Sequence, residues 1–426
     1  MISKWRWLLL QLSRKLWIRV SFFCLLAIAT ALVSALLDPL VPERLAERIG
    51  ASAVGDILNF LASSMLAVTT FSLSVMVSAY SAAATNGTPR ATALLMQDTT
   101  SQNVLATFLG TFVYALVGII AMNAGVYGNS GLVAVYGVTV AVIALIVFTL
   151  FRWIEHLSSL GRISDTTTRV ERATYTAIHN RVGNMAMGGR ILNDPASDIP
   201  DDARPVYTEL IGYLRHLAAD HLSAAAESAK GEIYVAVLPG QFVHPAMPIA
   251  YLKGFPEDHD LKPIRKAFEI GRDRSFDQDP RFGLVVLSEI ASKALSSAVN
   301  DSGTAKDILA RAIRLLLVWG QKEVSAEAPE PRFPRVWIPP LLIADLFNDM
   351  FIPIARDGAS HVDIHIALQN GLGALYASDH PDLRSEAKRH SELAMERARK
   401  SLQLTDEIER VERLAANLRE TRAYRS

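Results

Sequence analysis

Two long stretches of the chain, Ile57–Pro89 and Thr99–Phe151, contain no Asp, Glu, Lys or Arg. A soluble domain rarely keeps so many consecutive residues uncharged, whereas a membrane-crossing helix needs about 20 mostly apolar residues. The charges lie elsewhere, because residues 1–151 contain 13 of them and residues 152–426 contain 73. The sequence therefore predicts a membrane domain followed by a domain in water.

Four segments have the length and composition of transmembrane helices, and they define a transmembrane domain over residues 1–151. They cover about residues 20–37, 57–83, 104–122 and 131–151.

The charges that flank the first segment predict its direction. Lys4, Arg6, Arg14, Lys15 and Arg19 precede it without an acid among them, and acids outnumber bases in the loop that follows. Because cytoplasmic loops carry the excess of Lys and Arg, both termini are predicted to be cytoplasmic. A cleavable signal peptide is the alternative, although its basic region would be unusually long.

The remaining residues predict a mainly α fold with a small β module. We expect a mostly helical cytoplasmic α+β domain over residues 152–383. Apolar residues at helical spacing predict amphipathic helices over Thr168–Asn180 and Tyr207–Glu227. Short β segments are predicted over Gly231–Leu238 and Met247–Leu252.

Residues 384–426 predict a charged C-terminal helix. Leu404, Ile408, Val411 and Ala415 alternate by four and three, as in a coiled-coil seam. Two heptads do not decide between a coiled coil and a helix that docks onto its own domain.

The second predicted span carries a stripe of polar residues along one face. At 100° per residue its members fall within about 100° of one another. The polar stripe consists of Asp56, Asn59, Ser63, Thr70, Ser74, Ser78 and Ser81. Two interpretations stay open: close packing against another helix, or a water-filled path for an ion or small polar solute with Asp56 at its outer mouth.

One motif lies in the predicted membrane part of the chain and a second in the predicted soluble part. The first runs from Pro89-Arg90 through Leu94-Leu95, Asp98 and Gln102 to Phe108 and Tyr114. The second is Gln278-Asp279-Pro280-Arg281-Phe282-Gly283, which continues to Asn300-Asp301. In their order and content they resemble a widespread bacterial family of predicted membrane proteins known only as a domain of unknown function. The resemblance implies a multi-pass protein of the bacterial inner membrane and no particular activity.

Arg90, Asp98 and Gln102 lie in the loop before the third span. We interpret them as an anchor that fixes the entry of that span, or alternatively as a gating contact. In the second motif, Asp279 is a predicted N-cap, and Asp301 or Ser302 can cap the next predicted helix, Thr304–Gly320. Helix capping therefore accounts for Asp279, Asn300 and Asp301, and a ligand-binding turn is the alternative.

His361 and His365 are four residues apart, with Asp357 one step earlier. Without a third ligand this row predicts a solvated helix face rather than a metal site, and we expect no metal and no cofactor. No catalytic motif is present, so we expect no enzyme, and the zero net charge gives no reason to expect nucleic-acid binding.

These features favour a homo-oligomeric ion channel or transport-related protein of the inner membrane, with the cytoplasmic domain as its regulator. Its expected partners are the lipid bilayer, further copies of the chain, and a small ion or polar solute. The alternative is a membrane-anchored sensor or scaffold without a conduction path.

Overall fold

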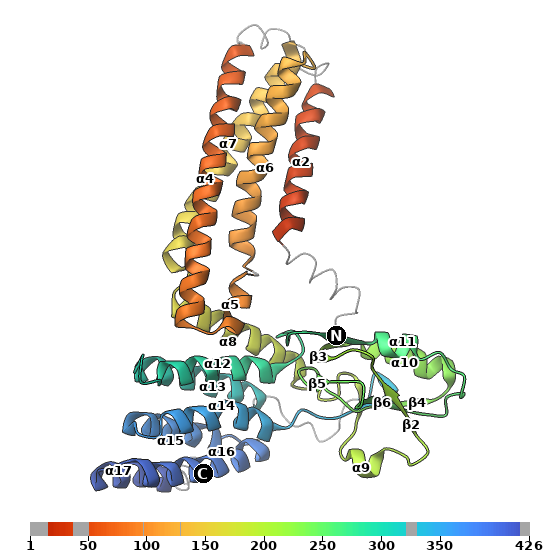
Figure 1. Ribbon diagram of the computed structural model, residues 1–426, viewed down its shortest axis with the longest axis vertical. Coiled ribbons are helices and arrows are strands. Elements are labelled where there is room, and N and C mark those ends of the chain that lie inside the picture. Colours follow the sequence, from red (N-terminus) through yellow and green to blue (C-terminus); the bar gives the residue numbers. More distant parts are fainter. Residues whose placement is uncertain (1–15, 37–50, 97, 128, 321–329, 418–426) are drawn as a thin grey trace. The chain divides into compact units, whose positions relative to one another are not determined.

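The computed structural model describes residues 16–36, 51–96, 98–127, 129–320 and 330–417 (Figure 1). The chain divides into two compact units, residues 5–166 and residues 167–426. Both are mainly helical, and all strands of the described residues lie in the second unit.

The first unit consists of long apolar helices and one short helix. Their bounds are α2 Leu16–Leu36, α4 Ala51–Asn86, α5 Pro89–Met96, α6 Thr99–Asn123 and α7 Asn129–Ser159. α6 is the central helix, because it packs against α2, α4 and α7. Its span is 61% buried, against 28% for α4 and 22% for α7. The outer helices therefore present most of their surface to whatever surrounds the unit.

Three helices in the described part of the chain are long and apolar enough to cross a membrane. They cover Ser52–Thr85, Thr99–Asn123 and Gly131–Ser158, which contain the predicted second, third and fourth spans. Each extends past the predicted bounds, because charge and polarity mark the end of the lipid-like segment rather than the end of the helix. The predicted first span falls on α2 except for residue 37, which lies outside the described residues, and its crossing of the membrane stays a prediction.

Eight short strands form two sheets in the described residues of the second unit. They are β1 Gly189–Ile191, β2 Arg204–Tyr207, β3 Gly212–Leu217, β4 Glu232–Val235, β5 Phe242–Val243, β6 Pro248–Lys253, β7 Phe268–Gly271 and β8 Phe333–Ile338. One sheet has the order β1-β8-β4-β6-β2 and the other β5-β3-β7. β8 pairs in parallel with both β1 and β4, so a segment far along the chain lies inside the first sheet. α10 packs against this sheet and closes its core.

The second unit also contains ten helices among the described residues, of which α12 to α17 stack in pairs (Figure 1). Their bounds are α8 Ile163–Arg181, α9 Pro195–Asp198, α10 Ala219–Ala229, α11 Lys262–Lys266, α12 Pro280–Ala294, α13 Ser302–Gly320, α14 Ile343–Asp357, α15 Val362–Tyr376, α16 Pro381–Ser401 and α17 Thr405–Asn417. α12 packs on α14 and α14 on α16, while α13 packs on α15 and α15 on α17. Each pair therefore buries the apolar faces of the next.

The predicted helix over Tyr207–Glu227 is wrong in its first half. Gly212–Leu217 forms strand β3, and the helix α10 begins at Ala219. Leu214 and His216 are buried, whereas Tyr213 and Arg215 are half-buried, which is the two-residue alternation of a strand. A buried histidine broke the apolar pattern, so the alternation was not visible in the sequence. The β module is accordingly larger than the two predicted segments.

The predicted C-terminal helix is interrupted, because α16 ends at Ser401, Leu402 is extended, and α17 begins at Thr405. Val411 is fully buried, and Ile408 packs with it against α16. Docking onto its own domain is therefore what the described part of the tail does, and residues 418–426 lie outside the described residues.

Candidate functional site

The polar stripe lies on α4 and points away from the core of the first unit. All seven of its side chains, Asp56, Asn59, Ser63, Thr70, Ser74, Ser78 and Ser81, are exposed. The buried face of α4 instead carries Leu58, Met65 and Met76, which pack into the core. Packing of the stripe against another helix of the same chain is therefore not observed among the described residues.

Several hydroxyls of the polar stripe are already hydrogen-bonded within α4. Ser63 donates to the Asn59 carbonyl, and Ser74 and Ser78 donate to the carbonyls four residues earlier, each at 3.0 Å. Such bonds allow a hydroxyl to face lipid. Asp56 and Asn59 differ, because their side chains make no hydrogen bond within the described residues. These two side chains need water, a lipid headgroup or another subunit.

Asp98 ties together two helices of the first unit. As the N-cap of α6, its Oδ2 accepts hydrogen bonds from the Ser101 amide at 2.9 Å and the Ser101 hydroxyl at 2.6 Å. The same oxygen lies 2.7 Å from Nε2 of His156 on α7. The side chains of Asp98 and His156 are 6% and 13% exposed, so the pair is largely shielded from solvent. Asp98 thus anchors the start of α6 and fastens it to the end of α7.

Ser101, His156 and Asp98 are not arranged as a catalytic triad. A triad places the acid at one ring nitrogen of the histidine and the serine at the other. Here Nε2 lies 2.7 Å from Asp98 and 3.2 Å from the Ser101 hydroxyl, so both partners share one nitrogen. The arrangement holds helices together and does not activate the serine.

The other two predicted loop residues lie on either side of Asp98. Gln102 is buried on α6, and its Nε2 donates to the Met96 carbonyl at 2.9 Å, which closes the turn between α5 and α6. Arg90 is exposed on α5. Asp98 and Gln102 therefore belong to the helix junction itself, while Arg90 lies at its surface.

Asp279 is the most buried acid of the second unit's motif, at 2% exposure. It is the N-cap of α12, as predicted, and accepts a hydrogen bond from the Phe282 amide at 3.1 Å. Its Oδ2 also accepts from Nε and Nη2 of Arg274, each at 2.8 Å. Gly240, at φ +96°, lies so close that a Cβ atom there would overlap the carboxylate. Burial raises the pKa of Asp279 to about 6, although Arg274 acts in the opposite direction.

The residues beside Asp279 connect the β module to the helices. The Gln278 side chain accepts from the Leu217 amide at 2.8 Å and donates to the Leu217 carbonyl at 3.3 Å, so it extends the edge of β3. On the other side, Arg281 binds Asp349 at 2.6 Å and Asp345 at 2.8 Å on α14. The predicted motif is thus a junction between β3, the turn at Gly240 and the helices α12 and α14, which capping alone did not predict.

Asn300 and Asp301 form the turn between α12 and α13. Asp301 caps α13 by accepting from the Thr304 amide at 3.0 Å. Asn300 adopts a left-handed backbone with φ 51°, and its Oδ1 lies 3.1 Å from Nε2 of His361. The structure does not bring this turn together with Asp279, since the two ends of α12 separate them.

His361 and His365 are not equivalent. His361 is the N-cap residue of α15, whereas His365 is fully buried and its Nε2 lies 2.9 Å from the Ala359 carbonyl. Asp357 is the last residue of α14, so it does not lie on the helix that carries His365. Within the described ranges no group of three His, Cys, Asp or Glu residues is placed to hold a metal.

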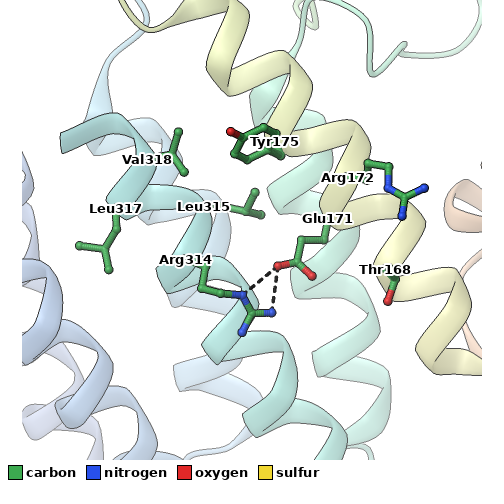
Figure 2. Close-up of a pocket in the computed structure, with 8 residues that line it drawn as sticks. All are labelled: Thr168, Glu171, Arg172, Tyr175, Arg314, Leu315, Leu317 and Val318. Carbon is green, nitrogen blue, oxygen red and sulfur yellow. Dashed lines mark hydrogen bonds and ion pairs between the residues drawn. The ribbon is translucent and has the colours of Figure 1, made fainter. Parts of the chain in front are cut away.

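A groove of about 510 Å³ lies between α8 and α13 (Figure 2). Figure 2 shows Glu171 and Arg314 facing each other at its rim, beside Tyr175, Leu315 and Val318. Glu171 binds Arg311 at 2.6 Å and Arg314 at 2.9 Å, so its charge is compensated. The groove is an apolar recess with a neutralised acid at its rim, and none of the predicted site residues lines it.

Sequence reasoning missed the partners of the predicted acids. His156 was visible as the first histidine of the chain, just past the fourth apolar span. Arg274 precedes Asp279 by only five residues, but the segment between them has no regular pattern, so the sequence did not predict that the two side chains bind each other. Arg181, at the end of α8, carried no signal, because its proximity to Asp279 arises only from the tertiary fold.

Known proteins resemble this chain over much of its length. A family described as "Predicted membrane protein (DUF2254)" matches residues 13–374. Similar proteins include an uncharacterised protein of Mycobacterium bovis and uncharacterised proteins of two Mycobacterium tuberculosis strains, each 26% identical over 222 residues. That stretch covers 50% of this chain and 42% of each relative, so less than half of their length is represented. No solved structure matches the chain.

The family match includes both the apolar helices and the junction around Asp279. Because it extends over most of the sequence, the chain belongs to the family described as "Predicted membrane protein (DUF2254)".

Proposed function

We propose that this membrane protein is a homo-oligomeric channel or transport-related protein of the bacterial inner membrane, in which the polar stripes of several α4 helices face a shared aqueous path. The supporting observation is that all seven side chains of the stripe are exposed on the single chain. The stripe points out of its own bundle, so a path along it has to be completed by further copies.

Asp56 and Asn59 distinguish an aqueous neighbour from lipid. The hydroxyls bonded to their own helix tolerate hydrocarbon, but a carboxylate and a carboxamide without protein partners are costly there. Both residues lie in the apolar helix segment Ser52–Thr85. Water held between subunits would solvate them, and Asp56 would favour cations at the outer mouth of the path.

The contact of Asp98 with His156 is the proposed gating element. It joins the start of α6 to the end of α7 at 2.7 Å, on the side that the charge pattern assigns to the cytoplasm. A regulatory signal from the cytoplasmic domain would act on this end of the helices. Catalysis forms no part of the proposal, because the serine, histidine and acid converge on one nitrogen.

The test is water accessibility of single cysteines on a Cys24→Ala background. We expect cysteines at Ser63, Thr70 and Ser74 to react with small charged thiol reagents in intact membranes, and cysteines at Leu66 and Leu73 not to react. Leu66 and Leu73 are 49% and 48% exposed on the single chain, so they match the stripe residues in being exposed. They lie outside the polar stripe, and in the proposed assembly they would face lipid. Equal protection of all five positions would contradict the shared path.

Oligomeric state is tested separately by mass measurement in detergent. We expect more than one subunit in the full-length protein, and the same number after removal of residues 384–426. Ala67, which continues the polar stripe, is exposed, and Ala67→Trp should disrupt the assembly or block its axis. A monomeric full-length protein would discard the shared path.

A membrane-anchored sensor or scaffold without a path is the second candidate. It is favoured by the hydrogen bonds of Ser63, Ser74 and Ser78 to their own helix, since these hydroxyls have no need of water. The cysteine experiment separates the two candidates.

A further inference from the structure

The sheet β5-β3-β7 has one face in the core of the second unit and one face turned outward. Leu214, Val243 and Ile270 belong to the inner face, where they pack into the core. Side chains alternate between the two faces along a strand, so the residues between these three lie on the outer face. There Tyr213 of β3 pairs with Phe242 of β5, and their rings meet edge to face with centroids 5.4 Å apart.

The outer face is apolar although it is exposed. Phe242 is 51% exposed, and Ile211, two residues before Tyr213, is 66% exposed, so none of the described elements covers them. Single exposed apolar side chains are ordinary, whereas a contiguous group of them marks an interaction site. We call Ile211, Tyr213 and Phe242 the outer patch.

A cation lies at one end of the outer patch. Arg215 follows Tyr213 by two residues and is half-buried, and a Cβ atom on Gly271 would overlap its Cδ, so its stem lies along the sheet beside Tyr213. Neither β3 nor β5 contains an acid, and Glu209, which precedes β3, binds Arg265 at 3.3 Å. Aromatic and aliphatic side chains beside a basic residue are the composition of surfaces that bind the interface of a bilayer.

The chain itself keeps a bilayer within reach of the second unit. The protein belongs to a family of membrane proteins, and only residues 160–162 separate α7, which is long and apolar enough to cross a membrane, from α8. A surface tethered in this way meets the bilayer at a high effective concentration, so a few side chains suffice for contact. A protein partner arriving from solution would need roughly 20–30 residues on each side, far more than the outer patch offers.

We propose that the outer patch docks the second unit onto the bilayer surface, with Ile211 and Phe242 inserted at the boundary between headgroups and acyl chains. Such insertions reach about 5–10 Å into this boundary. Arg215 contacts the anionic headgroups, which attract basic residues at the cytoplasmic leaflet. The proposal is independent of the path along α4.

The experiment uses the full-length protein in nanodiscs that contain phosphatidylglycerol, with single spin labels on a Cys24→Ala background. Oxygen concentrates in lipid and a nickel chelate stays in water, so the ratio of their collision rates with a label reports its surroundings. We expect this ratio to be several-fold higher for Ile211→Cys and Phe242→Cys than for Leu342→Cys and Leu404→Cys. Leu342 and Leu404 are matched controls, because they are apolar residues of the same unit that are 56% and 61% exposed.

Two further variants test the chemistry of the contact with the label kept at Ile211→Cys. Phe242→Asp should lower the collision ratio to that of the controls, whereas Leu342→Asp should leave it unchanged. Arg215→Gln should lower the ratio in nanodiscs with phosphatidylglycerol to the value measured in nanodiscs of neutral lipid.

Equal access of the nickel chelate to all four labelled positions would overturn the proposal. Labels on the outer patch that are shielded from both reagents, or that couple magnetically to the label of a second copy, would also overturn it, because a protein surface rather than lipid then covers the outer patch.

Discussion

The two units of the protein satisfy their polar groups in different ways. Along α4 of the first unit, hydroxyls bond to carbonyls four residues earlier and the side chains face outward. In the second unit, polar side chains bond across long stretches of chain, as Gln278 does with Leu217, 61 residues away. The first pattern keeps a polar helix intact in any environment. The second makes the fold depend on a few buried side chains.

The difference has an energetic consequence. Replacing a side chain that is hydrogen-bonded only within its own helix lowers the free energy of unfolding little, because its removal leaves no buried atom without a partner. Removing a side chain that compensates a buried charge elsewhere in the fold leaves that charge uncompensated and costs more. Substitutions of such side chains in the two units should therefore lower the free energy of unfolding by amounts that differ several-fold.

The largest effect is expected at the junction of the second unit. Asp279→Ala removes the cap of α12 and the one acid among the described residues that binds Arg274, so the free energy of unfolding should fall by about 4 kcal/mol at pH 7. Asp345→Ala is the matched control, because Arg281 keeps its bond to Asp349 and the cost should stay below about 1 kcal/mol. Urea unfolding of both variants measures the difference, and equal costs would contradict the contrast between the units.

His390 should give the second unit a marked dependence on pH. It is 3% exposed and packs against the rings of Phe347 and Phe351, and burial lowers its pKa to about 4, with Arg389 acting in the same direction. In the unfolded chain the pKa is about 6.5. The unfolded state then binds the proton first, so this contribution is complete above pH 6.5 and is lost as the pH falls through 4, by about 3 kcal/mol in all.

Asp279 acts with the opposite sign, since its raised pKa makes the folded state bind a proton between about pH 4 and 6. Its contribution is complete below the unfolded pKa of about 4 and is lost as the pH rises through 6. In the wild type the two contributions to the pH dependence of stability therefore partly cancel. The difference in stability between the wild type and His390→Leu isolates the contribution of the histidine. We expect the two proteins to be similar at pH 7 and the variant to be the more stable below pH 5. A pH-independent difference would exclude His390 as the titrating group.

The smallest effect is expected on the polar stripe. Ser74→Ala should change the stability of the detergent-solubilised protein by less than about 0.5 kcal/mol, because the hydroxyl is exposed and bonded only to its own helix. Thr139→Val, in the same unit, should cost about 1 kcal/mol, because Thr139 is buried and lies 3.1 Å from the hydroxyl of Tyr114 on α6. If Ser74→Ala proves as costly as Thr139→Val, the stripe is packed against another subunit rather than facing water.

Sequence reasoning located the features whose signal is local. The three apolar helices, the cap at Asp279 and the cap at Asp301 each depend on residues within one or two turns. Their prediction needed only hydropathy and the unpaired amides at the start of a helix. The outward direction of the polar stripe was not predictable, because periodicity places residues on one face and does not say what that face meets.

Apart from the pairing of Arg274 with Asp279, the missed features join distant segments. Asp98 and His156 are 58 residues apart, and Arg311 reaches Glu171 across 140 residues. β3 was mistaken for helix because His216 interrupts its apolar alternation, and only the tertiary fold reveals that this histidine is buried. Such pairings are set by tertiary packing, which no window of sequence contains.

The place of β8 within its sheet has a consequence for biosynthesis. The ribosome releases β1, β4 and β6 long before β8, since α12 and α13 are translated in between. Until residues 333–338 emerge, β1 lacks the strand that joins it to β4, and the apolar face of the sheet stays open. Non-local strand pairing of this kind is slow and leaves edges exposed to wrong partners. A nascent chain that stalls before residues 333–338 have emerged from the ribosome should therefore bind chaperones, and elongation until they have emerged should end that binding.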